Sequence, residues 1–225
     1  MSTTPTELIL IRHGETDWNR ELRFQGHIDV PLNDTGHEQA RRLGLRMALE
    51  AVDVLYCSDL LRTQQTAAPA AQQLGLTPIT QAALREQNFG IVEGLRADEI
   101  QERHPRAWEE WLEFHEDKGM PEGESARAFH TRILDALGRI VRAETGRRVM
   151  VVTHGGALDM VWRTVHGLGL HGPRRSDIPN AGFNRIRIAD AADPSGIEIL
   201  DWADTRHLAD MPPQPSYDQS RHLVK

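Results

Sequence analysis

The sequence is poor in cysteine and has no excess of basic charge. Among its 225 residues Cys57 is the one cysteine, which excludes an internal disulfide and is typical of a protein from a reducing compartment. Lysine and arginine number 26 against 33 acidic residues, which gives a formal net charge of -7. Because non-specific binding of nucleic acids requires a basic excess, we expect no nucleic-acid partner. A small anionic ligand is compatible with this charge, since a pocket can be locally positive on a negative protein.

Long hydrophobic runs are also missing. The first apolar run covers only Leu8–Ile11, which is far below the length of a signal-peptide core or a membrane span. We therefore predict a cytoplasmic protein without membrane contact. Near the other end, Pro212, Pro213 and Pro215 lie among polar residues. This composition predicts one domain over residues 1–203, followed by a polar tail over 204–225.

Several catalytic and cofactor motifs are absent from the sequence. A Walker A loop is missing, which counts against a bound nucleotide. Neither a His-Glu-x-x-His nor a Cys-x-x-Cys pair suggests a zinc site, and no Gly-x-Ser-x-Gly elbow suggests a nucleophilic serine. We expect neither a metal nor a cofactor.

Short continuous apolar runs alternate with helical patterns along the chain. Such runs are typical of strands buried in a parallel sheet, and they occur at 7–11, 52–56 and 149–152. Helical periodicity with capping residues predicts helices at 36–51, 60–74 and 125–145. Strand followed by helix, repeated, predicts an α/β fold with helices on both faces of a mostly parallel sheet, completed by late strands at 183–188 and 197–202.

The stretch 88–124 does not fit this alternation. It is rich in charge, and Trp108 and Trp111 are spaced for one face of a helix. We predict an insertion that lies over the active edge of the sheet as a lid and contributes to substrate selection. The residues that could contact the substrate are Arg96, Arg103, His104, Arg106, Trp108, Trp111 and Lys118. For most of them, a place on the solvated face of a charged helix is an equally good interpretation.

Polar motifs follow the three early strands directly. They are Arg12-His13-Gly14, Ser58-Asp59-Leu60-Leu61-Arg62 and Thr153-His154-Gly155-Gly156. Because the carboxyl ends of parallel strands share one edge of the sheet, the two His-Gly pairs can face each other across one pocket. The glycine after each histidine lets a backbone N–H come close to a bound group.

Two histidines and two arginines form a coherent set for phosphoryl transfer. Arg12 and Arg62 offer planar forks of donors that match a phosphate group. A neutral imidazole can attack phosphorus and leave again, and fixed cations can stabilise the transition state without a metal. Taken alone, each residue has a simpler explanation, because most histidines are surface or hydrogen-bonded residues and Arg62 could be a surface charge. The combination favours catalysis.

Together these motifs resemble a known family. The run Leu10-Ile11-Arg12-His13-Gly14-Glu15-Thr16, followed by Trp18-Asn19, resembles the signature of the histidine phosphatase superfamily, which includes cofactor-dependent phosphoglycerate mutase. Further matches follow in the family's order: Arg23-Phe24-Gln25-Gly26, Asp29-Val30-Pro31-Leu32-Asn33, Ser58 to Ala67, Leu84-Arg85-Glu86 and Thr153-His154-Gly155-Gly156. The resemblance implies a three-layer α/β/α sandwich around a mostly parallel sheet.

The resemblance also implies a role for each matching residue. His13 is expected to carry the phosphoryl group, and Arg12, Arg62 and His154 to hold it. Glu86 is expected to protonate the leaving oxygen and then to activate water. The residues expected to line the phosphate site are Asn19, Gln25, Gly26 and, through its backbone N–H, Gly155.

The sequence departs from the mutases where they recognise substrate. Phe89 and Ala97 stand where mutases carry tyrosine and lysine, and Gly156 stands where they carry asparagine. Their adjacent arginine pair has no clear counterpart between Trp111 and Glu124. We therefore predict a histidine acid-type phosphatase that hydrolyses a small phosphorylated metabolite. A mutase is the alternative, and a non-catalytic binding protein is disfavoured because the core residues occur together.

Overall fold

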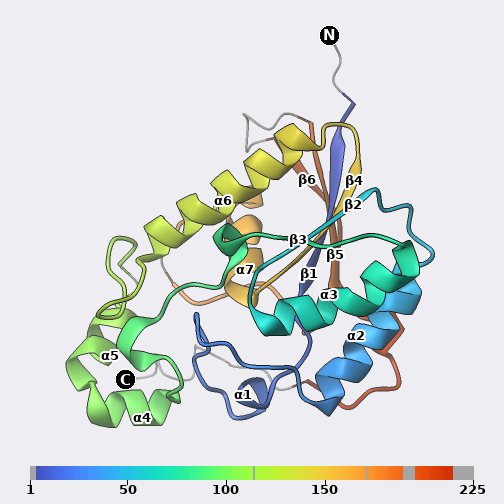
Figure 1. Cartoon of the computed structure of the whole chain (residues 1–225). Coiled ribbons are helices and arrows are strands. Elements are labelled where there is room, and N and C mark those ends of the chain that lie inside the picture. Colours follow the sequence, from blue (N-terminus) through green and yellow to red (C-terminus); the bar gives the residue numbers. More distant parts are fainter. Residues whose placement is uncertain (1–3, 114, 171, 190–195, 215–225) are drawn as a thin grey trace.

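The computed structural model describes residues 4–113, 115–170, 172–189 and 196–214 (Figure 1). Within these ranges one sheet has the strand order β3-β2-β4-β1-β5-β6. The strands are β1 (Thr6–Arg12), β2 (Val54–Cys57), β3 (Ile79–Thr80), β4 (Arg148–Thr153), β5 (Phe183–Ile188) and β6 (Ile197–Asp204). The helices are α1 (Asp17–Arg20), α2 (Asp34–Met47), α3 (Leu61–Leu74), α4 (Ala97–Arg103), α5 (Pro105–Leu112), α6 (Ala126–Ala143) and α7 (Gly155–Val165).

Strand direction changes across the sheet. β1, β2, β3 and β4 pair in parallel, whereas β5 pairs antiparallel with both β1 and β6. β1 and β4 are neighbours in register, and Arg12 lies opposite Thr153. The central strands therefore end together, which sets the residues that follow them side by side at one edge.

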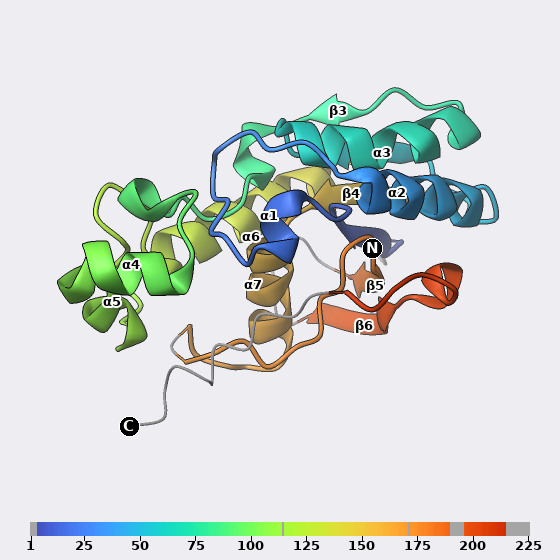
Figure 2. The same ribbon diagram turned by 90° about the horizontal axis from the view of Figure 1, so that it is seen from below.

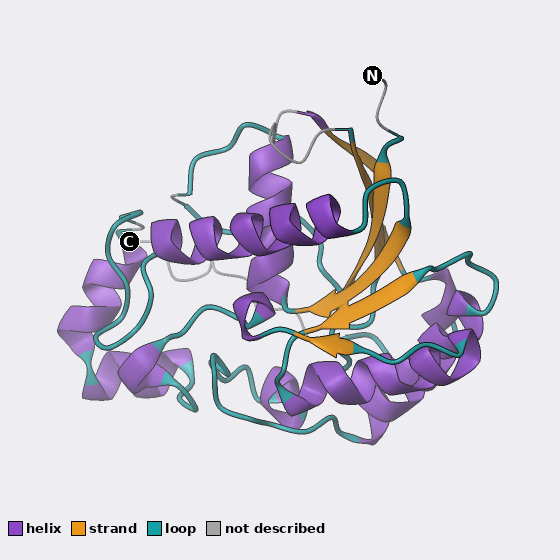
Figure 3. Ribbon diagram, turned by 45° about the horizontal axis from the view of Figure 1, so that its top comes forward, coloured by secondary structure: helices purple, strands orange, loops and turns teal. Residues whose placement is uncertain are grey.

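Helices cover both faces of the sheet, as Figures 2 and 3 show. On one face, Leu8, Leu10 and Val151 pack against apolar residues of α6 and α7. On the other face, alternate residues of the same strands, such as Ile9 and Ile11, pack against α2 and α3. The alternation follows from the pleat of a strand, whose successive side chains point to opposite faces. The predicted three-layer α/β/α fold is confirmed.

Local capping explains where the helices begin and end. The side chains of Asn33 and Ser125 accept hydrogen bonds from the backbone at Gly36 and Ala128, and so cap α2 and α6. α3 ends at Gly75, which takes a left-handed conformation with φ of 65°. α2 is shorter than the predicted helix 36–51 and ends at Met47, because the residues that follow lack core contacts; Leu49, for example, is 88% exposed.

The insertion, residues 88–124, carries α4 and α5 beside the sheet rather than within its layers (Figure 1). It has a small core of its own, which holds Val92, Ile100, Trp108 and Met120. A separate apolar cluster allows this segment to fold as a unit against the rest of the domain.

The segment that follows β6 packs onto the domain as far as it is described. Asp204 forms an ion pair with Arg46 of α2 at 2.6 Å, and Leu208 is buried. Residues 215–225 of the predicted tail lie outside the described ranges. No helix in the described part of the chain is long and apolar enough to cross a lipid bilayer.

Candidate active site

His13 and His154 come together because they follow two adjacent strands. The backbone N–H of His13 donates to the carbonyl of Thr153 at 2.9 Å, which continues the β1–β4 pairing by one residue. The two imidazole rings meet edge to face with their centroids 5.3 Å apart. The sequence predicted this meeting from strand direction alone.

The ring of His13 is held in one tautomer. Its Nδ1 lies 2.7 Å from the carbonyl oxygen of Gly14, and a carbonyl can only accept, so Nδ1 carries the hydrogen. Burial, followed by the charges of Arg62 and Arg12, holds the pKa of His13 well below its usual range. A neutral ring protonated at Nδ1 leaves the lone pair on Nε2. His13 is therefore prepared to act as a nucleophile through Nε2.

Arg12 and Arg62 are each fixed through backbone carbonyls. Arg12 donates from Nη1 to Ile178 at 2.7 Å. Arg62, which is fully buried at the start of α3, donates to Ile28 at 2.9 Å and to Gly26 at 2.8 Å. Burial lowers the pKa of both guanidinium groups to about 10, so both remain charged at neutral pH. They present two fixed positive charges beside the imidazoles.

Polar atoms at this site are buried without a hydrogen-bond partner among the described residues. They include Nε of Arg12, Nε of Arg62, Oε1 of Gln25 and both ring nitrogens of His154. Buried polar groups are normally paired, so such a concentration requires an explanation. Among these atoms, Nε of Arg12, Nε of Arg62 and one ring nitrogen of His154 are donors, and donors without a protein acceptor are suited to the oxygens of an anionic ligand, whereas Oε1 of Gln25 can only accept.

A cavity of about 720 Å³ opens over these residues. Of the predicted site residues it is lined by Arg12, His13, Asn19, Gln25, Arg62 and Glu86. Gly26, His154 and Gly155 are not among the lining residues. The carbonyl of Gly26 instead accepts a hydrogen bond from Arg62. Gly26 has a φ of +49°, and a Cβ on it would collide with the side chain of Glu93. His154 is fully buried beside His13.

Glu86 reaches the same cavity from the segment after the 3₁₀ turn Ala82–Leu84. Its Oε2 accepts from the backbone N–H of Gly156 at 2.9 Å, and its Oε1 accepts from that of Gln87 at 3.0 Å. A Cβ on residue 156 would lie 2.1 Å from Oε1 of Glu86. The glycine is therefore needed for the carboxylate to come this close to the start of α7.

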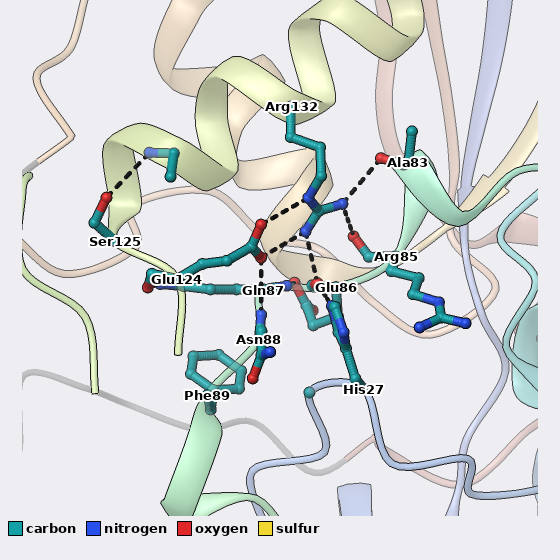
Figure 4. Close-up of polar contacts among 12 residues, drawn as sticks. His27, Ala83, Arg85, Glu86, Gln87, Asn88, Phe89, Glu124, Ser125 and Arg132 are labelled. Atoms are coloured by element: carbon teal, nitrogen blue, oxygen red, sulfur yellow. Dashed lines mark hydrogen bonds and ion pairs between the residues drawn. The ribbon is translucent and has the colours of Figure 1, made fainter. Parts of the chain in front are cut away.

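Arg132, which the sequence analysis did not single out, holds the backbone around Glu86 (Figure 4). It donates to the carbonyls of Ala83, Arg85 and Glu86 at 2.9, 3.0 and 2.9 Å. It also forms a bidentate ion pair with the carboxylate of Glu124, donating from Nε at 2.8 Å and from Nη2 at 2.7 Å. A guanidinium has five N–H donors, and these contacts use all of them.

Glu124 and His27 extend this network around Glu86. The carboxylate of Glu124 accepts from the backbone of Asn88 at 3.0 Å, and its carbonyl accepts from the side chain of Gln87 at 2.8 Å. Nε2 of His27 lies 2.9 Å from the carbonyl oxygen of Glu86 (Figure 4). The end of the insertion and the loop before α2 therefore both contact the Glu86 segment.

Asn180 and Asn19 lie next to the end of β1, and the side chain of Asn180 donates to Oδ1 of Asn19 at 3.3 Å. The side chain of Asn180 donates to the carbonyl of His13 at 2.9 Å, and the backbone N–H of Ala181 donates to the carbonyl of Arg12 at 2.9 Å. Asn19 forms a capping box with Thr16 at the start of α1. The sequence placed Asn19 at the site and assigned no role to Asn180.

The insertion contributes to the wall of the cavity through Phe89, Glu110, Trp111, His115, Lys118 and Gly119. Of the residues that the sequence suggested for substrate selection, only Trp111 and Lys118 are among those that line the cavity. Arg96 pairs instead with Asp98 at 3.0 Å, and Ala97 is buried in the core of the insertion. Among the residues that the structure describes, no three His, Cys, Asp or Glu side chains gather to hold a metal ion.

Comparisons with known proteins agree with this geometry. A family model described as the histidine phosphatase superfamily (branch 1) matches residues 8–205. Phosphoglycerate mutase-like protein 4 of Arabidopsis thaliana is 36% identical over 206 residues, which cover 90% of this chain and 86% of that protein. Two solved structures are also similar. Bacillus stearothermophilus YhfR has a TM-score of 0.79 and 30% identity, over 90% of this chain and 99% of its own. A mycobacterial glucosyl-3-phosphoglycerate phosphatase, in complex with VO3, has a TM-score of 0.77 and 26% identity, over 88% of this chain and 99% of its own.

Proposed function

The chain belongs to the histidine phosphatase superfamily, and we propose that it is a phosphomonoesterase that passes the phosphoryl group of a small phosphorylated metabolite to His13 and then to water. The observation that carries the proposal is the state of His13. Its Nδ1–H is committed to Gly14, its ring is neutral, and its Nε2 lone pair lies beside two buried arginines.

In the first step, Nε2 of His13 attacks phosphorus and the bond from phosphorus to the ester oxygen breaks. Arg12, Arg62 and His154 hold the three equatorial oxygens, whose negative charge persists through the transition state. Glu86, which lines the same cavity, gives its proton to the departing alkoxide. The product alcohol leaves, and a phosphohistidine remains.

In the second step, the carboxylate of Glu86 takes a proton from water as the water oxygen attacks phosphorus. The phosphorus–nitrogen bond breaks, its electrons return to Nε2 of His13, and inorganic phosphate is released. Glu86 is then protonated again, so the cycle closes without a net change in the protein. The hydrogen bonds from Arg132 support this double role of Glu86. Arg132 holds the backbone of Glu86, while the side chain of Glu86 faces the cavity.

A phosphoglycerate mutase is the second candidate, and the name of the Arabidopsis relative favours it. A mutase must hold a carboxylate-bearing substrate in two orientations while the phosphohistidine is kept from water. Here the position of the mutase lysine is Ala97, which is buried in the core of the insertion. Arg96 is the neighbour that could replace the lysine, but it pairs with Asp98 and does not line the cavity. These features support hydrolysis.

The experiment that separates the two reactions follows both products from one substrate. Enzyme is incubated with 3-phosphoglycerate, and 2-phosphoglycerate and inorganic phosphate are measured together, with and without 2,3-bisphosphoglycerate. We expect phosphate as the product, if this substrate is accepted, and no stimulation by the bisphosphate. Isomer that appears much faster than phosphate and depends on the bisphosphate would establish the mutase instead.

A further inference from the structure

Leu22 has a backbone conformation that leucine rarely adopts. It is the second residue after the end of α1, and its φ is +56°. In this left-handed region Cβ crowds the backbone, so glycine is the usual residue, as Gly75 is at the end of α3. A leucine at this position therefore carries a conformational cost, and such strain points to a function of the side chain.

The turn after α1 does not need the side chain of Leu22. The N–H of Leu22 donates to the carbonyl of Asn19 at 3.2 Å, and the N–H of Arg23 donates to the carbonyl of Trp18 at 2.9 Å. These two bonds form a Schellman motif, which backbone atoms make alone and in which the left-handed residue is usually glycine. The described apolar clusters do not include Leu22 either, so neither the turn nor the core explains the leucine.

The side chain of Leu22 lies instead in the wall of the active-site cavity. It is 40% exposed, and it lines the cavity together with Trp18, Phe24 and Phe89. The rings of Phe24 and Phe89 meet edge to face with their centroids 5.1 Å apart. The N–H of Gly94 donates to the carbonyl of Phe24 at 2.7 Å, and a Cβ on Gly94 would lie 3.2 Å from the ring of Trp18. The segment after α1 and the start of the insertion therefore form one connected apolar wall.

The apolar wall is continuous with the phosphoryl site. Asn19, shortly before Leu22 in the chain, lines the cavity, and the carbonyl of Gly26, shortly after it, accepts from Arg62 at 2.8 Å. His13 and Leu22 line the same cavity of about 720 Å³, which leaves room beyond a phosphoryl group. An ester that binds with its phosphorus at His13 can therefore extend its alcohol part over Leu22. 

We propose that Leu22, together with Trp18 and Phe89, forms a subsite for the leaving alcohol, so that the preferred substrate is a phosphate monoester with an apolar chain or ring. Apolar groups that meet at this wall leave water, which favours binding in proportion to the area covered. The strained turn keeps the leucine side chain at the wall. The proposal rests on the phosphatase function proposed above and adds the class of alcohol.

The test uses n-alkyl phosphates from propyl to hexyl phosphate. Each added methylene lengthens the apolar chain and leaves the acidity of the alcohol unchanged, so differences in kcat/KM report contacts of the chain. We expect kcat/KM of the wild type to rise about two- to fourfold per methylene, the range for partial to full burial of a CH₂ group. Leu22→Gly and Leu22→Ala should both flatten this series, so that their loss grows from propyl to hexyl phosphate.

The melting temperature tests the strain separately from the substrate preference. Leu22→Gly should melt no lower than the wild type, because glycine adopts the left-handed conformation without a clash. Leu49→Ala is the matched control for the loss of an exposed leucine. Leu49 is 88% exposed and is not among the residues that line the cavity, so this variant should keep the wild-type series.

A wild-type series that stays flat would overturn the proposal and assign Leu22 to a contact outside the substrate. The wild-type series in Leu22→Gly, or an equal loss on every ester, would overturn it too, since Leu22 would then not contact the chain. A melting temperature of Leu22→Gly clearly below that of the wild type would contradict the strain from which the proposal starts. If the wild type released phosphate neither from these esters nor from an activated phenyl phosphate, the phosphatase function itself would be contradicted.

Discussion

The carboxylate of Glu86 accepts a hydrogen bond from the backbone N–H of Gly156 at 2.9 Å, and this close approach leaves no room for a side chain on residue 156. A Cβ on residue 156 would come within 2.1 Å of Glu86 and 3.0 Å of the ring of Phe129. Gly156, two residues after His154, therefore limits where the carboxylate of Glu86 can lie.

Gly156→Ala should displace Glu86 and slow the reaction while the protein stays folded. We expect kcat for an alkyl phosphate to fall by about 10²-fold, the effect of misplacing a catalytic group by roughly 1 Å. Gly196→Ala is the control, because a Cβ there meets nothing within 4 Å among the residues that the structure describes. Equal activity of the two variants would show that the contact between Glu86 and Gly156 has no role in catalysis.

Glu86→Gln removes the proton donor and leaves the shape of the side chain. For alkyl phosphates we expect a loss of about 10²–10⁴-fold, the range of general acid–base catalysis. Esters of an activated phenol need no proton on the leaving oxygen, so His13 should be phosphorylated from them with a much smaller loss. Single-turnover phosphorylation measured with both classes tests the role, and an equal loss on both would refute it.

Arg132→Ala should weaken the hold on the Glu86 segment, and we expect kcat/KM for alkyl phosphates to fall about tenfold or more. Activated phenyl esters should be affected less, since the loss acts through the acid. A purely structural role would lower both classes alike and would contradict the assignment. Arg127→Ala is the control on the same helix, because Arg127 is exposed and contacts only acidic residues of the insertion among the pairs described, Glu116 and Asp117.

Chelation tests the proposal that no metal takes part. Arg12 and Arg62 can supply the positive charge that a catalytic metal would otherwise provide, whereas burial holds the pKa of His154 well below its usual range, so its neutral ring contributes a hydrogen bond rather than charge. We expect kcat to be unchanged after dialysis against a strong chelator. Loss of activity that a divalent ion restores would contradict this account of the charge in the transition state.

Much of the fold was predictable because its elements are marked locally. Leu8–Ile11 is a continuous apolar run, and Asn33 and Ser125 are capping residues next to periodic helices. Strand β3 was missed because Ile79 and Thr80 are exposed and form only the edge of the sheet. The cytoplasmic location and the domain boundary near residue 203 remain predictions.

The core of the site was predictable because its motifs directly follow strands, whereas the supporting residues come from distant positions. No role was assigned to Asn180 from the sequence, because only the return of the chain to β1 brings it to His13. The position of Arg132 in the sequence does predict a structural role. It lies three residues after Phe129 and directly before Ile133, on the face of α6 that packs on the core, where a buried cation requires a partner.

The central claim is that His13 carries the phosphoryl group during turnover. The most direct measurement is rapid acid-free quenching with a ³²P-labelled ester, followed by peptide mapping of the trapped protein, with His13→Ala as the paired variant. We predict a label that is labile to acid and stable to alkali, located on the peptide that contains His13, and formed at the rate of turnover or faster. His13→Ala should stay folded, because His13 lies beyond the last residue of β1, and should show neither label nor phosphate release. Full turnover by His13→Ala, or a label on His154 instead, would contradict the account.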